Sequence, residues 1–316
     1  MKILIADAFD AKLPDRLAPF GEVWTDPARL PEADVVLVRS RTKVTREYLA
    51  GAPNLKLVIR GGVGLDNVDK PACVERGIEV LNTPQASSIA VAELAMALML
   101  AVPNQIVTAH NGMAEGKFLK SEIKRTELFR KTLGLIGFGA VGRAFARRVR
   151  GMDMRVMVTD PYLQQENLGG LGELVPLERL LAMADFVSLH VPLNSETRGL
   201  LSAQRLGQMK PTAYLINTAR AGIVDEDSLF NALASHQIAG AALDVFWDEP
   251  EIAPRWFTLD NVLLTPHLGG AADDVKAHHA AMVIEDILTL ESGGIPARMV
   301  NPEMLRHAKS QEGKTR

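Results

Sequence analysis

Short apolar runs alternate with longer helical patterns along most of the chain. The runs that predict strands are KILIA, DVVLVR, KLVIR and IEVLN within the first hundred residues, and then TLGLIGF, RVMVTD, FVSLHVP, AYLINTA, AALDVF and NVLLTPH. These runs are apolar almost without interruption, which is typical of parallel strands that helices cover on both faces. The pattern therefore predicts an α/β protein with two doubly wound parallel sheets.

A helix separates the two series of strands. Ser87 or Ser88 is a suitable cap for this helix, and its apolar residues continue to about Val102. Another helical pattern, over residues 273–290, follows the last strand and would return the chain to the first domain. We therefore assign residues 1–99 and 286–316 to one domain and residues 100–285 to the other. The polar ending HAKSQEGKTR is expected to be frayed.

Composition and charge narrow the classes of function. The 316 residues, 47% hydrophobic and 23% charged, have the composition of a globular protein with a large core. A formal net charge of -3 gives no electrostatic support for nucleic acid or an anionic membrane as a partner. The lone Cys73 argues against a disulfide framework and a cysteine-rich metal site, and no metal site is predicted. Neither a signal peptide nor a membrane span is indicated, so we expect a cytoplasmic protein.

A glycine-rich turn joins the run TLGLIG to the helical pattern AVGRAFARRV. Gly137, Gly139 and Gly142 have the spacing GxGxxG, and Asp160 ends the next strand 18 residues after the last of them. Such glycines let the backbone approach a pyrophosphate at a helix N-terminus, while the carboxylate accepts hydrogen bonds from the adenosine ribose. The context predicts dinucleotide binding, and the carboxylate, which would repel a 2′-phosphate, favours NAD. A role as a turn residue before Pro161 would explain the turn but not this spacing.

Three polar residues follow the ends of later strands, where a parallel sheet presents its ligand crevice. They are Arg220 after AYLINTA, Glu249 beyond AALDV and His267 after NVLLTP. Each has an ordinary surface explanation, but together they suit the oxidation of a secondary alcohol. Histidine would be the base, the carboxylate would orient it, and the guanidinium would hold a substrate carboxylate. His190 is a competing base, although its strand context favours a structural or cofactor-wall position. The other histidines, His110, His236, His278, His279 and His307, are expected at the surface.

Two arginines, Arg39 and Arg41, follow the apolar run from Val35 to Val38. If the chain stays extended, they lie on the same side, about 7 Å apart at their backbones. Two like charges placed together favour an anion, but a solvated strand end is also an adequate explanation. This segment alone leaves both interpretations open.

The order of the motifs resembles the D-isomer-specific 2-hydroxyacid dehydrogenase family, and most closely its phosphoglycerate dehydrogenase branch. The similar segments, RGGVGLDNVD, LGLIGFGAVG, SLHVPL, INTARAGIVDE, GAALDVFWDEP and LLTPHLGG, cover nearly the whole chain to about residue 300. The resemblance implies a central Rossmann domain that binds NAD and a flavodoxin-like substrate domain built from both chain ends. It also implies a homodimer that uses the helix around Glu93 to Leu100 and the segment after it. The C-terminal regulatory domain of larger relatives is not expected in this chain.

The resemblance also implies roles for individual residues. Arg220 would bind the substrate carboxylate and carbonyl oxygen, His267 would be the acid or base, and Glu249 would orient it. Asp244 would hold the nicotinamide carboxamide, unless it is only a helix or turn cap. Ala221 replaces a glycine that is frequent in the family, which is harmless if the backbone there needs no positive φ. The other implied cofactor residues are Val63, Gly137, Gly139, Ala140, Val141, Gly142, Asp160, Val191, Thr218, Gly269 and Gly270.

The substrate within this family depends on its second anionic group. Backbone amides near Val63 and Gly64, together with Arg220, suffice for one carboxylate, whereas a phosphate needs a further cationic clamp. The candidates for that clamp are Arg39, Arg41 and Arg60, with Lys43 as a less certain helper. We therefore expect interconversion of 3-phosphoglycerate and 3-phosphohydroxypyruvate, as in serine biosynthesis. The alternatives are a glyoxylate or hydroxypyruvate reductase, a dehydrogenase of another dianion such as sulfolactate, and, from another class, an NAD-sensing protein like the corepressors of this fold.

Overall fold

The computed structural model of this chain describes residues 1–300 and divides them into two compact units. Unit 1 comprises residues 1–87 and 272–300, and unit 2 comprises residues 88–271. The units divide close to the starts of α4 (Ser88–Ala101) and α10 (Asp273–Glu291), whereas the boundaries inferred from the sequence fall inside these two helices. The predictions of a surface position for His307 and of a frayed ending HAKSQEGKTR lie outside the described residues.

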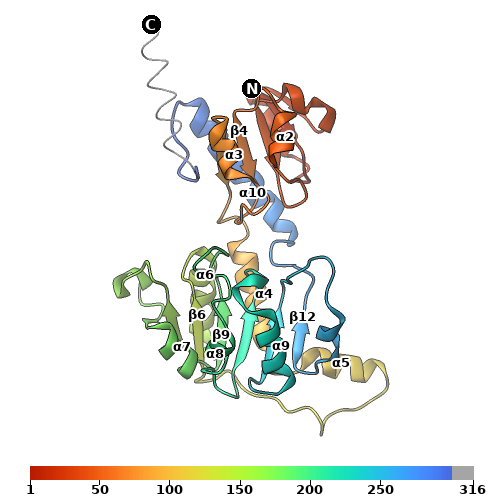
Figure 1. The fold of residues 1–316 in the computed structure, drawn as a ribbon, viewed down its shortest axis with the longest axis vertical. Helices are drawn as coiled ribbons and strands as arrows, with labels where there is room; N and C mark the ends of the chain where they lie inside the picture. The colour runs from red at the N-terminus through yellow and green to blue at the C-terminus, as the bar shows by residue number, and fades with distance from the viewer. Residues whose placement is uncertain (301–316) are drawn as a thin grey trace. The chain divides into compact units, whose positions relative to one another are not determined.

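Unit 1 is a parallel sheet with helices on both faces, and its strand order is β2-β1-β3-β4-β5 (Figure 1). The strands are β1 (Lys2–Ile5), β2 (Glu22–Trp24), β3 (Val35–Val38), β4 (Leu57–Arg60) and β5 (Glu79–Asn82). The helices are α1 (Leu13–Leu17), α2 (Arg46–Ala50), α3 (Lys70–Glu75) and α10, with 3-10 turns at Ala18–Phe20 and Pro27–Glu32. Helices α2 and α3 pack on one face of the sheet, and α1 and α10 on the other. This order confirms the predicted flavodoxin-like topology.

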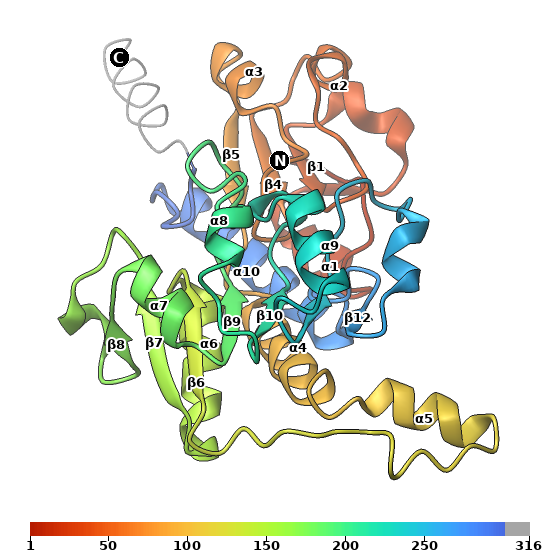
Figure 2. The ribbon, with the colours of Figure 1, turned by 60° about the horizontal axis from the view of Figure 1, so that its bottom comes forward.

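Unit 2 is a second parallel sheet, of order β12-β11-β10-β9-β6-β7-β8 (Figure 2). Its strands are β6 (Thr132–Ile136), β7 (Arg155–Thr159), β8 (Glu173–Leu174), β9 (Phe186–Leu189), β10 (Tyr214–Asn217), β11 (Gly240–Leu243) and β12 (Val262–Leu264). Its helices are α4, α5 (Ile106–Ala114), α6 (Ala140–Val149), α7 (Leu177–Met183), α8 (Ala203–Leu206) and α9 (Glu226–Ala234). If β6 is numbered as strand 1, the order becomes 3-2-1-4-5-6-7. This is the order of a Rossmann sheet with one added strand, which confirms the predicted fold class.

Helices cover both faces of the sheet in unit 2, which explains its uninterrupted apolar strands. On one face, Leu98 of α4 and Phe145 of α6 are buried against the strands. On the other face, Leu180 of α7, Leu206 of α8 and Leu229 of α9 are buried in a separate cluster. The loops at the strand ends, rather than the covered faces, are therefore where this unit can bind a ligand.

Two edge strands were not predicted from the sequence. In the described part of the chain, β2 pairs only with β1, and β8 pairs only with β7. Their residues are exposed or half-buried, so no apolar run marks them. These short segments are extended because their backbones pair with a neighbouring strand. The pattern of their side chains does not predict this.

Helix α4 contains the most apolar segment of the chain and packs into the core of unit 2. No single helix among the described residues is long and apolar enough to cross a membrane. Helices α4 and α5 together pass that test by length and composition, but they are bent by 67° at the break between them. Ala92, Ala95 and Met99 of α4 are fully buried in the core of unit 2.

The prediction that His279 lies at the surface is wrong. This residue is on α10 and is 1% exposed, whereas His110, His236 and His278 are exposed as predicted. It belongs to a stripe of buried residues four apart along the helix, with Val275, Val283 and Ile287. This spacing places one face of a helix against a core. Burial, followed by the charges of neighbouring basic residues, lowers the pKa of the His279 imidazole to about 3.

Candidate functional site

The strands of unit 2 end side by side, so the loops that follow them share one edge of the sheet. In the register, Ile136 pairs with Thr159 and Leu189, and Asn217 pairs with Leu189 and Leu243. Leu243 in turn pairs with Leu264, the last residue of β12. All of these pairs are parallel, and a parallel sheet binds its ligands at this carboxyl edge. The loops at the edge and the first turn of α6 contain Gly137, Gly139, Ala140, Val141, Gly142, Asp160, Val191, Thr218, Arg220, Asp244, Glu249, His267, Gly269 and Gly270.

The glycine turn between β6 and α6 has a backbone that side chains would obstruct. Gly137 has φ of 92°, and a Cβ there would lie 2.7 Å from the His190 carbonyl oxygen. A Cβ at Gly142 would lie 2.6 Å from the Gly137 carbonyl oxygen, so the helix passes very close to the turn. At Gly139, the N-cap of α6, a Cβ would meet nothing within 4 Å. The start of α6 is therefore open to a ligand, and its uncapped N–H groups suit a phosphate.

Asp160, which directly follows β7, is hydrogen-bonded to the same glycine turn. Its Oδ2 accepts a hydrogen bond from the backbone N of Phe138 at 3.0 Å, and its Oδ1 accepts one from Tyr162 N at 3.1 Å. A carboxylate accepts about four hydrogen bonds, so it retains capacity for two hydroxyls of a ligand. The Thr218 hydroxyl at the end of β10 is buried without a hydrogen-bond partner in the described part of the chain. The turn, the carboxylate and the unsatisfied hydroxyl fit a bound dinucleotide.

His267 and Glu249 form a hydrogen-bonded pair after β12 and β11. The Nδ1 of His267 lies 2.7 Å from Glu249 Oε2, and Glu249 Oε1 accepts a hydrogen bond from Phe246 N at 2.9 Å. Because a carboxylate only accepts, Nδ1 carries the proton and Nε2 of His267 is left to exchange a proton with a ligand. His267 has φ of 53°, a left-handed conformation that is uncommon outside glycine and is often found at functional sites.

Asp244, at the end of β11, holds the loop that contains His267. Its side chain is 0% exposed and accepts hydrogen bonds from Thr265 Oγ1 at 2.6 Å, Leu268 N at 2.7 Å and Gly269 N at 2.9 Å. A Cβ at Gly269 would lie 3.3 Å from Asp244 Oδ2, so the backbone approaches this carboxylate closely. The carboxylate thus ties two neighbouring strand ends together, and one acceptor position remains for a ligand.

Arg220 leaves the end of β10 just before a short 3-10 turn, η5 (Ala221–Ile223). Its Nη1 donates a hydrogen bond to the Ala219 carbonyl at 2.7 Å, and its own carbonyl accepts one from Asn217 Nδ2 at 3.0 Å. The side chain is half-buried, which fixes the guanidinium near the sheet edge. Ala221 does not have a positive φ, so the condition under which it can replace glycine is met.

His190 is packed into unit 2 in a way that does not suit a base. Its Nε2 lies 3.0 Å from Ser188 Oγ, and its ring makes an edge-to-face contact with Phe145, with centroids 5.8 Å apart. Burial lowers the pKa of this imidazole to about 4. It is therefore neutral at pH 7 and a weak base, which favours the structural interpretation over the catalytic one.

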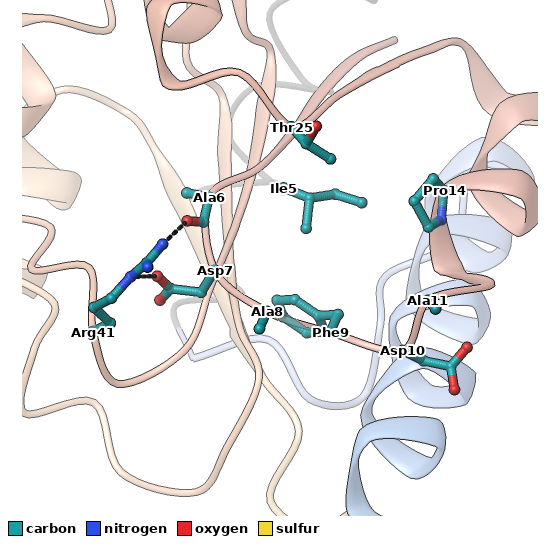
Figure 3. A pocket seen from close by; sticks show the side chains of 10 residues that line it. All are labelled: Ile5, Ala6, Asp7, Ala8, Phe9, Asp10, Ala11, Pro14, Thr25 and Arg41. Atoms are coloured by element: carbon teal, nitrogen blue, oxygen red, sulfur yellow. Dashed lines mark hydrogen bonds and ion pairs between the residues drawn. The ribbon is translucent and has the colours of Figure 1, made fainter.

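In unit 1 the chain bends after β3, so the assumption that it stays extended through Arg41 is wrong. The cause is Asp7, a buried residue that follows β1 and that the sequence reasoning missed. Its Oδ2 accepts hydrogen bonds from the backbone N of Arg39 at 2.6 Å and of Thr42 at 3.1 Å. Its Oδ1 accepts from Arg41 Nε at 3.2 Å (Figure 3). The same oxygen accepts from Thr42 Oγ1 at 2.8 Å.

The hydrogen bonds to Asp7 favour the ionised form of its carboxylate. Burial alone would raise its pKa, but the hydrogen bonds from Arg39, Thr42 and Arg41 lower it below the usual value. Asp7 is the second residue after β1, so a carboxylate close to the end of a strand was the signal in the sequence that could have found it. One of the two arginine charges therefore faces a carboxylate of the chain itself.

Arg39 and Arg41 point to different surroundings within unit 1. Arg41 turns toward Asp7 and the Ala6 carbonyl at the side of a hollow of about 320 Å³, and its side chain is 82% exposed (Figure 3). Arg39 is half-buried, and its Cγ lies 3.2 Å from a Cβ built on Gly61. A Cβ built on Gly62 would fall on the Arg60 guanidinium, so both arginines lie beside Gly61 and Gly62.

A glycine loop, residues 61–64, follows β4 in unit 1. Gly61 N donates to the Val38 carbonyl, Gly62 N donates to Thr83 Oγ1 at 2.8 Å, and the Val63 carbonyl accepts from Asn82 Nδ2 at 2.8 Å. The N–H groups of Val63 and Gly64 make no hydrogen bond to any residue that the structure describes. Two adjacent backbone donors of this kind suit a carboxylate.

Comparison with known proteins identifies relatives over both units. Residues 96–269 match the family model described as "D-isomer specific 2-hydroxyacid dehydrogenase, NAD binding domain". The chain is 39% identical to D-3-phosphoglycerate dehydrogenase of Synechocystis sp., an alignment that covers 94% of this chain and 55% of that protein. It is 42% identical to hydroxypyruvate reductase of Thermotoga maritima, with 82% of this chain and 85% of that protein covered. The chain thus spans little more than half the length of the first relative and most of the second.

A solved structure gives the same result for the fold. The D-lactate dehydrogenase of Aquifex aeolicus, complexed with NAD and lactic acid, superposes with a TM-score of 0.81 at 28% sequence identity. The superposition covers 94% of this chain and 98% of that one. The alignment with the Synechocystis protein and this superposition each cover 94% of the chain, so sequence and fold indicate the same kinship.

Proposed function

Because the chain belongs to the family of D-isomer-specific 2-hydroxyacid dehydrogenases, we propose that it interconverts a D-2-hydroxy acid and the corresponding 2-keto acid. The observation that carries this proposal is the pair of His267 and Glu249, which shares its sheet edge with the glycine turn and Asp160. A proton-transfer pair beside a dinucleotide site is what the oxidation of a secondary alcohol requires. The family's NAD-binding domain spans residues 96–269, and the cofactor is NAD.

The residues of unit 2 would perform the acid and base work. NAD, when bound, supplies the acceptor or donor of the hydride. His267 removes the hydroxyl proton through Nε2 in oxidation and returns it to the carbonyl oxygen in reduction. Glu249 holds Nδ1–H and stabilises the imidazolium that forms, while Arg220 binds the substrate oxygens through its guanidinium. Asp160 would hold the adenosine ribose, the start of α6 the pyrophosphate, and Asp244 the nicotinamide carboxamide.

The residues of unit 1 support a phosphorylated substrate. The free N–H groups of Val63 and Gly64 would bind the substrate carboxylate. Arg39 and Arg60, with Arg41 two residues after Arg39, would bind a phosphate on the third carbon. The named relative from Synechocystis sp. acts on such a compound, which also supports the interconversion of 3-phosphoglycerate and 3-phosphohydroxypyruvate.

A panel of keto acids tests the function directly. With NADH and equal protein, we expect kcat/KM for 3-phosphohydroxypyruvate to exceed that for hydroxypyruvate by roughly 10- to 100-fold, because one charge-assisted hydrogen bond contributes about 1.5–3 kcal/mol. Glyoxylate, pyruvate and sulfopyruvate complete the panel, and steady-state oxidation of NADH is the measurement. A higher kcat/KM for hydroxypyruvate would contradict the phosphate assignment and leave the reaction class intact.

Two matched variants separate the arginines in that panel. Arg39→Met should remove most of the preference for the phosphorylated acid and leave hydroxypyruvate reduction nearly unchanged. Arg41→Met tests whether the arginine that Asp7 engages also contacts the substrate; an equal loss with both acids would assign it to loop structure. Binding of NADH without turnover of any acid would favour the NAD-sensing class instead.

Hydroxypyruvate reduction is the second candidate, and one observation favours it. The relative from Thermotoga maritima carries that name, and this chain covers 85% of its length. Its substrate would need the Val63 and Gly64 amides and Arg220 but no phosphate clamp. The preference in the panel therefore decides between the two candidates.

Helix α5 and the segment after it support the proposal of a homodimer. Ile106, Val107 and Met113 of α5 and Phe118 beyond it are exposed apolar residues. In Figure 2 this part of unit 2, coloured yellow, extends away from the sheet. Because several large apolar side chains exposed on one segment often mark a protein–protein interface, a second copy of the chain is the occupant that we propose.

The oligomeric mass tests this surface. We expect light scattering after gel filtration to give about twice the 34.3 kDa of one chain, because burial of these side chains stabilises the dimer by about 25 cal/mol per Å² of apolar surface. The double variant Ile106→Glu, Met113→Glu should give the mass of one chain. Phe257→Glu, which charges an equally exposed apolar residue elsewhere in unit 2, is the control and should leave the mass unchanged. A wild-type mass of one chain at micromolar concentration would refute the dimer.

A further inference from the structure

The buried His279 has contacts that the catalytic proposal does not use. Its Nδ1 lies 2.6 Å from the hydroxyl of Thr83, which directly follows β5. The same hydroxyl oxygen accepts the hydrogen bond from Gly62 N at 2.8 Å, and Thr83 N donates to the Gly62 carbonyl at 3.2 Å. A chain of hydrogen bonds therefore runs from helix α10 to the 61–64 loop, entirely within unit 1.

We propose that His279, acting through Thr83, is a positioning residue for the 61–64 loop and thereby sets the affinity for the substrate carboxylate. This inference rests on the proposed function, in which Val63 N–H and Gly64 N–H bind that carboxylate. His279 touches neither substrate nor cofactor in this account. Its contribution is the orientation of the backbone donors.

The direction of each hydrogen bond follows from the chemistry of the groups. A threonine hydroxyl has one proton to donate, and its oxygen already accepts from Gly62 N–H. Burial first, and then the charges of Arg39 and Arg60, keep His279 neutral at pH 7. The hydroxyl proton has two acceptors within reach, His279 Nδ1 at 2.6 Å and the Arg60 carbonyl at 3.5 Å, and we assign it to the much nearer Nδ1, so that Nε2 keeps the imidazole proton. The hydroxyl is thereby fixed with its lone pairs toward Gly62.

This contact is one of the restraints on the loop, beside the hydrogen bonds of Gly61 N, the Gly62 carbonyl and the Val63 carbonyl. Gly62 has φ of 152° and is buried, and Thr83 is 0% exposed. Asn82 holds the Val63 carbonyl from the next strand, which fixes the neighbouring peptide that contains Gly64 N–H. With Gly62 N–H engaged by Thr83, the next two N–H groups are the ones left for a ligand. Loss of the hydroxyl would leave a buried donor unsatisfied and let this peptide rotate.

Paired substitutions test the inference in the full-length protein. Thr83→Val, which keeps the shape and removes the hydroxyl, should raise the KM of the preferred keto acid roughly 10-fold, equivalent to about 1.4 kcal/mol. We expect kcat to change less than about threefold and the Kd of NADH to stay constant, because unit 2 holds the proton-transfer pair and the cofactor residues. His279→Leu should give the same split between KM and kcat.

Conservative variants and a matched control exclude a general loss of structure. Thr83→Ser restores a hydroxyl, and His279→Asn restores an acceptor near the position of Nδ1, so both should recover most of the wild-type KM. Cys73→Ser places a polar group in the opposite core cluster of unit 1, and should lower Tm without raising KM. An unchanged KM in Thr83→Val, no recovery in Thr83→Ser, or equal losses in kcat and NADH affinity would overturn the inference.

A second readout keeps the inference separate from the proposed function. Hydrogen exchange of the Gly62 amide, measured by mass spectrometry without substrate, should be faster in Thr83→Val and His279→Leu than in the wild type. If the wild type reduces no keto acid, the proposed function fails, and unchanged exchange in these variants would also refute the positioning role. If the wild type is active and the variants match it in KM and exchange, only the inference fails.

Discussion

Replacing His267 by alanine should lower kcat by roughly 10²- to 10⁴-fold, the usual contribution of a positioned acid or base, while the Kd of NADH stays unchanged. The reason is that the proposed mechanism moves the proton through Nε2 of His267, the ring nitrogen that the hydrogen bond to Glu249 leaves free. Single-turnover and steady-state oxidation of NADH measure the loss, and fluorescence titration with NADH measures binding. Turnover within threefold of wild type would remove His267 from the mechanism.

Glu249→Gln is the informative companion, because an amide oxygen can still accept from Nδ1 but no longer stabilises the imidazolium by charge. We expect a smaller loss of kcat than in His267→Ala, because the amide still orients the imidazole although it cannot stabilise the imidazolium by charge. His236→Ala, which removes an exposed histidine elsewhere in unit 2, controls for the loss of an imidazole and should have no effect. If His267→Ala, Glu249→Gln and His236→Ala all lowered kcat equally, the losses would reflect a change in structure and not proton transfer.

The second large effect should follow substitution of Arg220. Arg220→Met removes the guanidinium, and kcat/KM should fall by roughly 10²- to 10⁴-fold, because two charge-assisted hydrogen bonds contribute about 1.5–3 kcal/mol each. Arg220→Lys keeps the charge but loses the planar fork that binds two oxygens at once, so an intermediate loss is expected. Steady-state kinetics with the preferred keto acid measure both.

Arg205→Met provides the control for Arg220. Arg205 is another half-buried arginine of unit 2, and its Nη1 donates to the Leu200 carbonyl at 2.9 Å, so its loss removes similar structural contacts. It should leave kcat/KM nearly constant. If Arg220→Lys were as active as wild type, a point charge would suffice and bidentate binding would be refuted.

Most of the strands that the sequence predicted correctly have a buried environment on both faces. β3, β4, β6 and β9 are largely apolar because helices cover both sides of each sheet. β2 and β8 have no such run, and only their backbone pairing with β1 and β7 makes them strands. Local composition therefore predicts the centre of a sheet better than its edges.

The same contrast applies to the candidate site. Gly137, Asp160 and His267 could be singled out because each follows a recognisable strand at a spacing with a chemical reason. The bend at Arg39 and Arg41 could not, since it depends on Asp7, which lies 32 residues before Arg39. His279 was misplaced for a related reason: its partner, Thr83, lies 196 residues before it.

The sequence alone determined the fold class, the dinucleotide turn and the candidate proton-transfer residues, because these depend on local periodicity and on the residues directly after each strand. Only the tertiary structure decided how the arginines are directed, that the histidine at 279 is buried and neutral, and which backbone amides remain free for a ligand. These properties arise from hydrogen bonds between distant segments, and the burial that gives such bonds their strength exists only once the segments have packed together.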